Sequence, residues 1–375
     1  MIDKGGFPHY MLKEIFEQPQ GLRDTILPRV AADAGSIRLD EVRIGREELC
    51  ALRRIHIVAS GTSRHAGMAG QFMIQELANL PADVDYASEF EYRNPMIGMG
   101  ELTIVITQSG ETADTTASQR EAKALGSRTI AISNVMGSTI AREADGVLYT
   151  NAGPEVSIAS TKAFTAQMAV LFLLAAYLGQ ERGNLKPDRV GRWIAQLLEI
   201  PAKVSTVLAT APQCEKLAEK FRTAQDFLFL GRAIHYPVAM DGALKLKEVS
   251  YVHAEGYPTG ETKHGPNALI DESLPVVILA TCDRNDPASL LRYEKSVANI
   301  KSFKQQGAKV IAIASEGDEI LCAIADHTIF IPQAPELLSP ILEIVPLQLF
   351  AYYMAVKKGL DVDRPRNLVK SVTQE

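Results

Sequence analysis

The chain has 375 residues, an apolar fraction of 46% and a formal net charge of −6 at pH 7. This length favours two or three domains or one duplicated unit, and the mildly negative charge, without a basic tract, argues against nucleic-acid binding. The four cysteines are far apart and form no CxxC pair, so they indicate free thiols of a reducing, cytoplasmic setting and not a disulfide framework. The amino terminus lacks the basic and apolar regions of a signal peptide.

The first predicted element is a short amphipathic helix over Tyr10–Gln18, with Leu12, Ile15 and Phe16 at helical spacing. We expect Pro19 to end this helix. Apolar runs separated by helical stretches then predict four strands: Ile55–Ala59, Thr103–Thr107, Arg128–Ser133 and Val147–Thr150.

The longest apolar run, Ala163–Leu178, is too short to span a bilayer comfortably and predicts a core helix and not a membrane anchor. A charged and largely helical stretch follows it. Continuous apolar strands between helices indicate a parallel sheet covered on both faces, so we predict the α/β class with two doubly wound parallel-sheet domains. The strands of the second domain are predicted at Phe227–Leu230, Pro275–Thr281, Lys309–Ala314 and Thr328–Pro332.

The two halves repeat short motifs in the same order, which indicates internal duplication. Gly61 and His65 of the first half match Gly231 and His235 of the second half, at an offset of 170 residues. Four later pairs share an offset of 181 residues: Gly126–Ser133 with Gly307–Ala314, Ala144-Asp145 with Ala325-Asp326, Pro154-Glu155 with Pro335-Glu336, and Gln167 with Gln348.

The predicted organisation is therefore two duplicated domains with added segments. These segments are an amino-terminal helical part, a helical linker and a carboxyl tail. In chain order the predicted boundaries are 1–44, 45–185 (first domain), 186–224 (linker), 225–360 (second domain) and 361–375 (tail).

The polar loop Thr107-Gln-Ser-Gly-Glu-Thr112 follows a buried strand and precedes a helical pattern over Thr115–Leu125. Such a loop leaves unpaired backbone N–H groups at the helix start, and Gly110 lets a ligand approach the backbone closely. A simple helix cap would need only one Ser or Thr. Because a Walker lysine and a GxGxxG motif are missing, a small phosphorylated metabolite is favoured over a nucleotide. The polar stretch Ser60–Ser63 ends the neighbouring strand and is expected at the same edge of the sheet.

The second half carries residues suited to acid–base chemistry. Lys245 and Glu248 are three apart on a predicted helix and share one face, amid apolar neighbours. The alternative interpretation is that Lys245 and Glu248 form a solvated ion pair without a catalytic role. His264 precedes Gly265 and Pro266, so it is expected on a turn, where it is a candidate general acid or base.

A metal site is the less favoured reading of the same region. It would combine Glu261 and His264 with Glu255 or His253. The spacing of these side chains matches no recognised metal signature, so we expect no metal.

Seven ordered motifs resemble the isomerase half of the glucosamine-6-phosphate synthase family, which consists of two sugar-isomerase (SIS) domains. The resemblance runs from one end of the chain to the other. The motifs are His9–Pro19, Ser60–Ser63, Gln108–Asp114, Ala159–Thr165, Gly242–Glu248, Lys263–Pro266 and Asp363–Thr373.

This resemblance implies roles for individual residues. His264 would open the ring of fructose 6-phosphate in a neighbouring subunit of a homodimer, Glu248 would move a proton between C1 and C2, and Lys245 would assist. Lys370 in the tail would form an imine with the ketone carbon, and no cofactor would be needed. Thr107 stands where the family usually has Ser. The implied substrate and phosphate contacts are Thr62, Ser63, Thr107, Gln108, Ser109, Thr112, Ile158, Ser160 and Val369.

The resemblance places the tail over the sugar, whereas a simple strap on the core is the other reading. Pro365 restricts the backbone there, and the apolar residues Leu368, Val369 and Val372 are expected to be buried.

One departure from the family is large. The family's glutaminase domain uses an amino-terminal Cys, but residue 2 here is Ile. We therefore expect glucosamine 6-phosphate to be made with free ammonia or with ammonia from a separate glutaminase, by an excised half or a free-standing protein. A free-standing deaminase would use the same residues in reverse, so the direction stays open. A non-catalytic sugar-phosphate sensor is disfavoured because it has no use for Glu248, His264 and Lys370.

Overall fold

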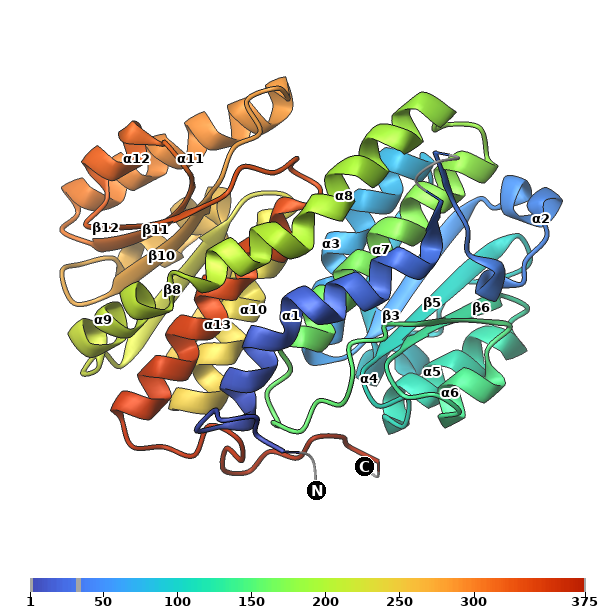
Figure 1. Cartoon of the computed structure of the whole chain (residues 1–375), viewed down its shortest axis with the longest axis horizontal. Coiled ribbons are helices and arrows are strands. Elements are labelled where there is room, and N and C mark those ends of the chain that lie inside the picture. Colours follow the sequence, from blue (N-terminus) through green and yellow to red (C-terminus); the bar gives the residue numbers. More distant parts are fainter. Residues whose placement is uncertain (1–2, 32–34, 374–375) are drawn as a thin grey trace. The chain divides into compact units, whose positions relative to one another are not determined.

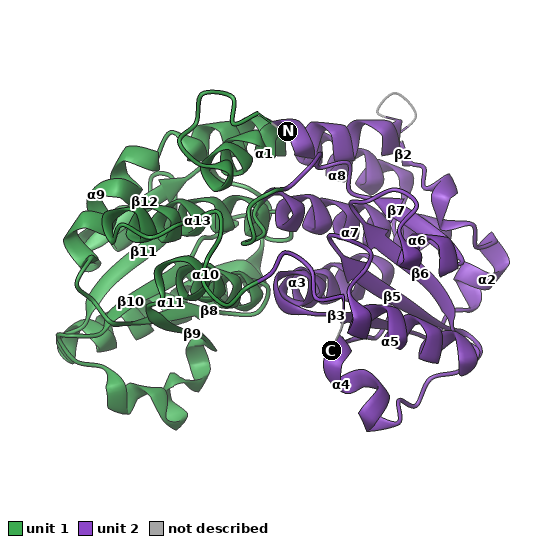
Figure 2. Cartoon of the chain, turned by 90° about the horizontal axis from the view of Figure 1, so that it is seen from below, with its two compact units in different colours: residues 1–19, 156–161, 200–368 green, residues 20–155, 162–199, 369–375 purple. Residues whose placement is uncertain are grey.

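The computed structural model describes residues 3–31 and 35–373, which form two compact units (Figures 1 and 2). Unit 1 comprises Met1–Pro19, Val156–Thr161 and Ile200–Leu368, and unit 2 comprises Gln20–Glu155, Lys162–Glu199 and Val369–Glu375. The chain thus contributes three separate segments to each unit. The sequence expectations for Ile2 and for the last two residues of the tail lie outside the described residues.

Unit 2 contains a five-stranded parallel sheet of strand order β4-β3-β5-β6-β7. Side chains alternate across it: Val58, Val105 and Ala131 pack with α5 and α6 on one face, whereas Ile57 and Ile106 meet α3 on the other. The elements are β3 (Arg54–Ala59), α3 (Gly61–Ala78), β4 (Ala82–Tyr86), α4 (Ala87–Phe90), β5 (Glu101–Thr107), α5 (Ala113–Ala124), β6 (Arg128–Ser133), α6 (Thr139–Glu143), β7 (Gly146–Tyr149) and α7 (Lys162–Glu181).

Unit 1 contains a second five-stranded parallel sheet, of strand order β12-β11-β10-β8-β9. In chain order this is the same arrangement as in unit 2, as the predicted duplication requires. The elements are α9 (Ala211–Phe221), β8 (Asp226–Gly231), α10 (His235–Ser250), β9 (His253–Pro258), η4 (Thr259–His264), η5 (Pro266–Leu269), β10 (Pro275–Ala280), α11 (Pro287–Gln305), β11 (Lys309–Ser315), α12 (Glu319–Ile324), β12 (His327–Ile331) and α13 (Ser339–Lys357).

Short elements precede the first sheet, and two helices run from one unit into the other. The two are α1 (Tyr10–Ile26) and α8 (Pro187–Leu208). The short elements are η1 (Leu27–Arg29), β1 (Val30–Ala31), β2 (Ser36–Ile37), η2 (Asp40–Val42), α2 (Arg46–Ala51) and η3 (Glu91–Arg93).

The predicted α/β class with two doubly wound parallel sheets is confirmed. All eight predicted strands are present, each within two residues of its predicted ends. The prediction missed β4 and β9, which lie at the sheet edges. Both carry polar residues and are partly exposed, so neither shows the continuous apolar run by which the other eight strands were identified.

The prediction that Pro19 ends the first helix is wrong, because α1 continues to Ile26 with Pro19 inside it. Proline has no N–H to donate to the carbonyl of Ile15, four residues earlier. The buried side chain of Gln18 supplies the missing donor, with 2.9 Å between its Nε2 and the Ile15 oxygen. This hydrogen bond satisfies the carbonyl that the proline leaves without its helical donor.

Asp363, in the tail, caps α1 from the other end of the chain. Its carboxylate accepts hydrogen bonds from the amides of Tyr10 (3.0 Å) and Met11 (2.9 Å), the first two of the helix. Its carbonyl accepts one from the amide of Ile158 at 3.1 Å. The first part of the tail is therefore a strap that binds three segments of unit 1 together.

Among the described residues, α7 and α13 are long and apolar enough to cross a membrane by length and composition. Each of them has 89% of its apolar window buried inside the structure. Core helices of globular proteins pass the same test, so the prediction of a core helix over Ala163–Leu178 agrees with this burial.

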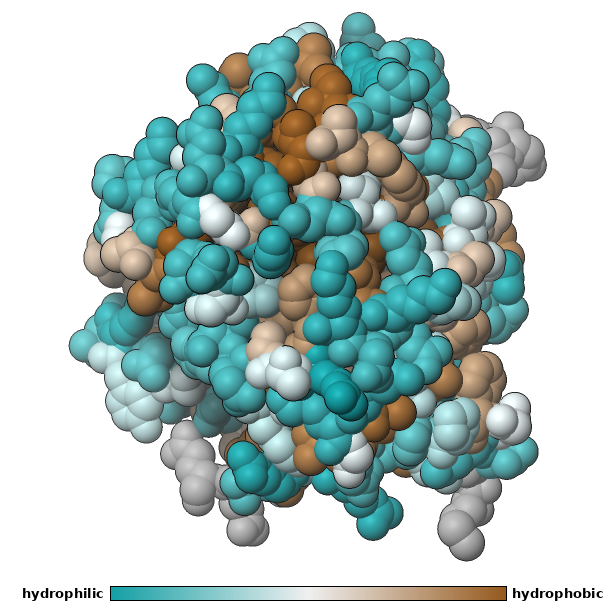
Figure 3. Space-filling view, turned by 90° about the vertical axis from the view of Figure 1, so that its left-hand side faces the viewer, coloured by the Kyte–Doolittle hydropathy of each residue, from teal (hydrophilic) through white to brown (hydrophobic). Residues whose placement is uncertain are grey.

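Figure 3 shows the face of unit 1 that carries α9, α11 and α12. Hydrophilic residues cover most of it, and hydrophobic residues lie between them. The exposed large hydrophobic residues of α11 and α12 are Leu290, Leu291 and Ile320. Scattered exposure of this kind is ordinary for a protein surface.

Candidate functional site

The polar loop of unit 2 forms a tight turn between β5 and α5. The hydroxyl of Thr107 accepts a hydrogen bond from the Gly110 amide at 3.2 Å, and it lies 3.2 Å from the hydroxyl of Thr112. The amide of Glu111 donates to the hydroxyl of Ser109, also at 3.2 Å. The loop is thus organised by its own hydroxyl groups, and the amides of Gly110 and Glu111 are paired, whereas the sequence pattern was expected to leave such N–H groups unpaired.

Gly110 cannot be replaced without moving its surroundings. Its φ is +71°, and a Cβ there would lie 2.0 Å from the Oγ of Ser138. The next residue fixes the loop to α6, since the amide of Thr139 donates to the Glu111 carboxylate at 2.8 Å. That hydrogen bond lowers the pKa of Glu111. The loop is therefore held against the start of a neighbouring helix.

A second group of hydroxyls lies at the same edge of the sheet. β3 pairs in parallel with β5, with Ala59 opposite Ile106, so both strands end together. Thr62 and Ser63 stand in the first turn of α3, directly after β3. The Ser63 hydroxyl accepts a hydrogen bond of 3.0 Å from the Gln167 side chain, which fixes it.

The last part of the tail belongs to this unit and contacts the polar loop. The hydroxyl of Ser371 lies 2.9 Å from that of Ser109, and the carbonyl of Val372 accepts a hydrogen bond from the Ala113 amide at 3.1 Å. Lys370 donates from its Nζ to Oε2 of Glu155 at 2.7 Å. The Lys370 side chain is 26% exposed and that of Glu155 is fully buried. The structure thus places Lys370 in the unit that holds the polar loop.

The expectation that the apolar residues of the tail are buried is wrong. Leu368, Val369 and Val372 are 40%, 66% and 49% exposed. Hydrogen bonds and an ion pair hold this segment in place, so its position does not depend on burying apolar side chains.

Unit 1 brings Lys245 and Glu248 together on α10, as predicted. Their Nζ and Oε2 atoms are 2.6 Å apart. The Lys245 side chain is fully buried and that of Glu248 is 20% exposed, so this is not a solvated surface pair. Salt screens such a partly buried pair much less than a pair on the surface.

The other candidates of unit 1 lie on irregular segments. His264 is exposed at the end of η4, before Gly265 with φ +152°, so the predicted turn is correct. Ile158 and Ser160 lie in the segment Val156–Thr161, where the Ile158 amide donates to Asp363. Unit 1 thus holds five candidate residues, and unit 2 holds the other eight.

The alternative metal set finds no support in the described part of the chain, where no group of three or more His, Cys, Asp or Glu side chains could hold a metal ion. His253, a member of that set, is exposed and lies 2.9 Å from Asp226. Its Nε2 also lies 3.9 Å from Glu255, another member of that set.

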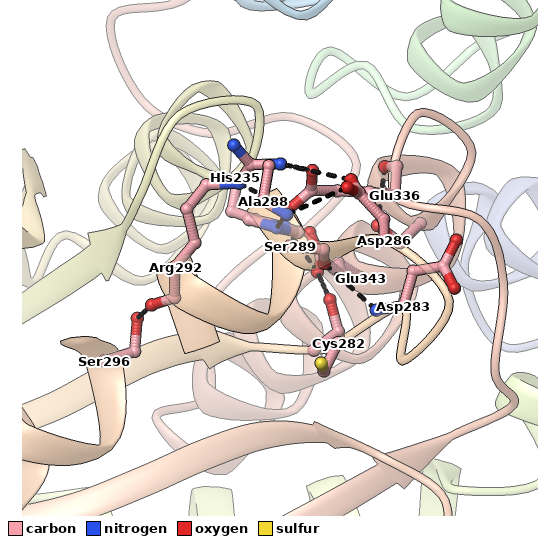
Figure 4. A network of polar contacts seen from close by, with 12 residues as sticks. His235, Cys282, Asp283, Asp286, Ala288, Ser289, Arg292, Ser296, Glu336 and Glu343 are labelled. Carbon is pink, nitrogen blue, oxygen red and sulfur yellow. Dashed lines mark hydrogen bonds and ion pairs between the residues drawn. The ribbon is translucent and has the colours of Figure 1, made fainter. Parts of the chain in front are cut away.

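Sequence reasoning missed the role of Glu155 as the partner of Lys370. The only signal was the repeated Pro-Glu dipeptide, which the duplication places again at Glu336. In unit 1, Glu336 belongs to a buried network at the carboxyl ends of β8 and β10 (Figure 4).

Two carboxylates surround His235 in this network. Its Nε2 lies 3.2 Å from Glu336 and its Nδ1 lies 2.8 Å from Glu343. Burial alone would lower the pKa of His235, but the two carboxylates outweigh it and raise the pKa to about 10. Arg292 also donates to Glu336 at 2.8 Å. Burial would raise the pKa of Glu336, but His235 and Arg292 lower it to about 2.

A model of the SIS domain family matches residues 48–177 and 220–358. The chain belongs to the SIS domain family. The matched residues include both sheets, and the expected resemblance to the isomerase half of the synthases is confirmed by the relatives of this SIS protein.

Two curated relatives are glutamine–fructose-6-phosphate aminotransferases (isomerizing). That of Clostridium tetani is 47% identical and that of Thermus thermophilus is 48% identical, in each case over 100% of this SIS protein and 60% of the relative. The chain thus spans about 60% of the length of these relatives.

Solved structures give the same fold. The C-terminal domain of glucosamine-fructose-6-phosphate aminotransferase from Francisella tularensis is 36% identical, with a TM-score of 0.90 over 97% of this SIS protein and 100% of that chain. Glucosamine-6-phosphate deaminase from Thermotoga maritima, at 22% identity and a TM-score of 0.72, covers 97% of this chain and 99% of that one and shows the shared fold alone.

Proposed function

We propose that this SIS protein is a cytoplasmic enzyme that converts fructose 6-phosphate to glucosamine 6-phosphate with ammonia as the nitrogen donor. The observation that carries the proposal is the position of Lys370. Its amine is held by Glu155, and the next residue, Ser371, contacts the hydroxyl loop. The relatives that cover the whole chain are named as glutamine–fructose-6-phosphate aminotransferases.

The hydroxyl loop and the first turn of α3 bind the phosphate in this proposal. Backbone N–H groups at a helix start together with hydroxyl donors suit an oxyanion. Val369, Ser160 and the backbone of Ile158 contact the sugar. The phosphate ligands are Thr62, Ser63, Thr107, Gln108, Ser109 and Thr112.

The chemistry is assigned to four residues. His264 opens the sugar ring, and the Lys370 amine then forms an imine with the ketone carbon. A cationic imine nitrogen withdraws electrons from the adjacent carbon and makes its proton easier to remove. Glu248 moves that proton between C1 and C2, and the buried Lys245, 2.6 Å away, orients the carboxylate and assists the transfer.

Two observations favour synthesis over the alternatives. The aminotransferase relatives are 47–48% identical, whereas the deaminase structure is 22% identical. The buried pair of Lys245 and Glu248 has no purpose in a non-catalytic sensor.

The purified 375-residue chain is expected to form glucosamine 6-phosphate from fructose 6-phosphate and ammonium, or to interconvert fructose and glucose 6-phosphates slowly. Glutamine is not expected to replace ammonium in this assay, because these 375 residues match the C-terminal domain of the aminotransferases. A coupled assay of each sugar phosphate measures this, with Glu248→Gln as the inactive control. Product formed from glutamine by the pure chain, or no turnover of either sugar, would contradict the proposal.

We also propose a homodimer in which His264 serves the site of the second copy. The residue is exposed on a turn, where a partner can reach it. Mixing a His264→Ala chain with a Glu248→Gln chain should then restore activity, because half of the sites in a mixed dimer with shared residues regain both groups. A mixed dimer, verified by mass, that stays inactive would contradict the shared site.

A further inference from the structure

The duplicated Pro-Glu dipeptide places one buried carboxylate in each unit, and each binds a cation. In unit 1, Glu336 binds Arg292 and His235. In unit 2, Glu155 binds Lys370 at 2.7 Å. An arginine cannot give up its proton in a protein, whereas a lysine amine must do so before it attacks a carbonyl. Glu155 and Glu336 thus occupy equivalent positions in the duplication, but Glu155 faces a cation that can transfer a proton, whereas the Arg292 bound to Glu336 cannot.

We propose that Glu155 is the proton shuttle for imine formation at Lys370. The proposal rests on the proposed function and deepens it by naming the group that serves the reacting amine. Glu155 accepts one proton from the ammonium, and the neutral amine attacks the ketone carbon. The carboxyl group returns this proton to the oxygen, and the carboxylate then moves a second proton from the nitrogen to the same oxygen, which leaves as water.

The step balances without an added reactant. The ammonium and the ketone give an iminium and one water molecule, so the positive charge stays on nitrogen. A new C–N bond forms and the C–O bond breaks, with both electrons of the latter leaving on oxygen. Glu155 ends the step as the carboxylate with which it began.

The surroundings of Glu155 suit this role. Its Oε1 accepts a hydrogen bond from the Ala163 amide at the start of α7, at 3.2 Å, which leaves Oε2 directed at Lys370. The other tail contacts described above go to a hydroxyl and a backbone amide, at Ser109 and Ala113, and neither accepts a proton at neutral pH. A carboxylate that is fixed, buried and in contact with the amine meets the geometric requirement for a general base.

The test is borohydride trapping of the imine with fructose 6-phosphate. A lost general acid–base group costs about 10²–10⁴-fold in rate, so Glu155→Gln should be trapped at least about 100-fold more slowly than the parent protein. Binding of glucitol 6-phosphate, which has no carbonyl, should change by less than about threefold, which also shows that the variant is folded. Glu47→Gln, which removes an exposed carboxylate of α2 in the same unit, is the matched control.

Chemical rescue separates a proton shuttle from an anchor for the tail. Added acetate or formate should speed trapping in Glu155→Ala at least tenfold, because a small carboxylate fills the space of the lost side chain. Trapping of Glu155→Gln at the parent rate, or slow trapping of Glu155→Ala without rescue, would overturn the inference. Absence of trapping in the parent protein would instead overturn the proposed function.

Discussion

Replacing Lys370 with methionine is expected to abolish both turnover and borohydride trapping. Methionine keeps an unbranched stem of similar length but has no amine, so no imine can form. Phosphate binding should remain, because the polar loop is stabilised by its own hydrogen bonds at Thr107 and Ser109. Mass spectrometry of the trapped protein should find the sugar on Lys370 of the parent chain and no sugar on the variant.

Lys357→Met is the control for this change, since Lys357 pairs with Glu215 on another part of the chain and should be trapped as the parent is. Sugar found on Lys245, or full activity after deletion of Leu368 to Glu375, would show that the tail is only a strap.

Replacing His235 with alanine is expected to lower the free energy of unfolding by about 3–5 kcal/mol, because it leaves the buried Glu343 without the imidazolium and leaves Glu336 with Arg292 alone. Glu343 is fully buried and Glu336 nearly so, and both lie within 3.2 Å of the imidazole. Urea unfolding of both proteins at pH 7 measures the difference. His253→Ala removes an exposed histidine of the same unit and should change the value by less than about 1 kcal/mol.

The pH dependence of the same experiment has a defined sign. The pKa of His235 is raised to about 10 in the folded state, above an unfolded value of about 6.5. The stabilisation of the folded state by the charged His235 is therefore fully present below about pH 6.5 and is lost as the pH rises through 10. The pKa of Glu336 is lowered to about 2 in the folded state. Ionised Glu336 therefore stabilises the folded state above its unfolded pKa of about 4.3, and this stabilisation is lost as the pH falls towards 2. If the difference in the free energy of unfolding between the parent and His235→Ala does not shrink toward pH 10, the histidine is neutral in the folded protein.

Local signals in the sequence predicted eight of the ten strands of the two large sheets and the polar loop after β5. Each inner strand is an apolar run, and the loop Thr107–Thr112 carries its hydroxyl groups and glycine within six consecutive residues. Signals of this kind need no knowledge of distant contacts. The edge strands β4 and β9 lack them, because polar residues such as Asp83, Asp85 and Glu255 interrupt any apolar run, whereas β7 and β12 at the opposite edges were predicted.

The missed features depend on side chains that meet only in the folded chain. Lys370 and Glu155 are 215 positions apart, and nothing near either residue predicts the other. Pro19 misled the helix prediction because the compensating donor is the side chain of Gln18. The prediction that Val369 and Val372 are buried was wrong for a different reason. A tail held by hydrogen bonds does not have to bury its apolar residues.

Unit 2 takes its final segment, Val369–Glu375, from beyond both sheets. During synthesis these residues leave the ribosome after every described strand and after Thr107–Thr112. On the proposed function, a chain that stopped before Lys370 would still bind a sugar phosphate but would lack the amine that converts it. The order of synthesis would then complete the binding loop before it supplies the reacting amine.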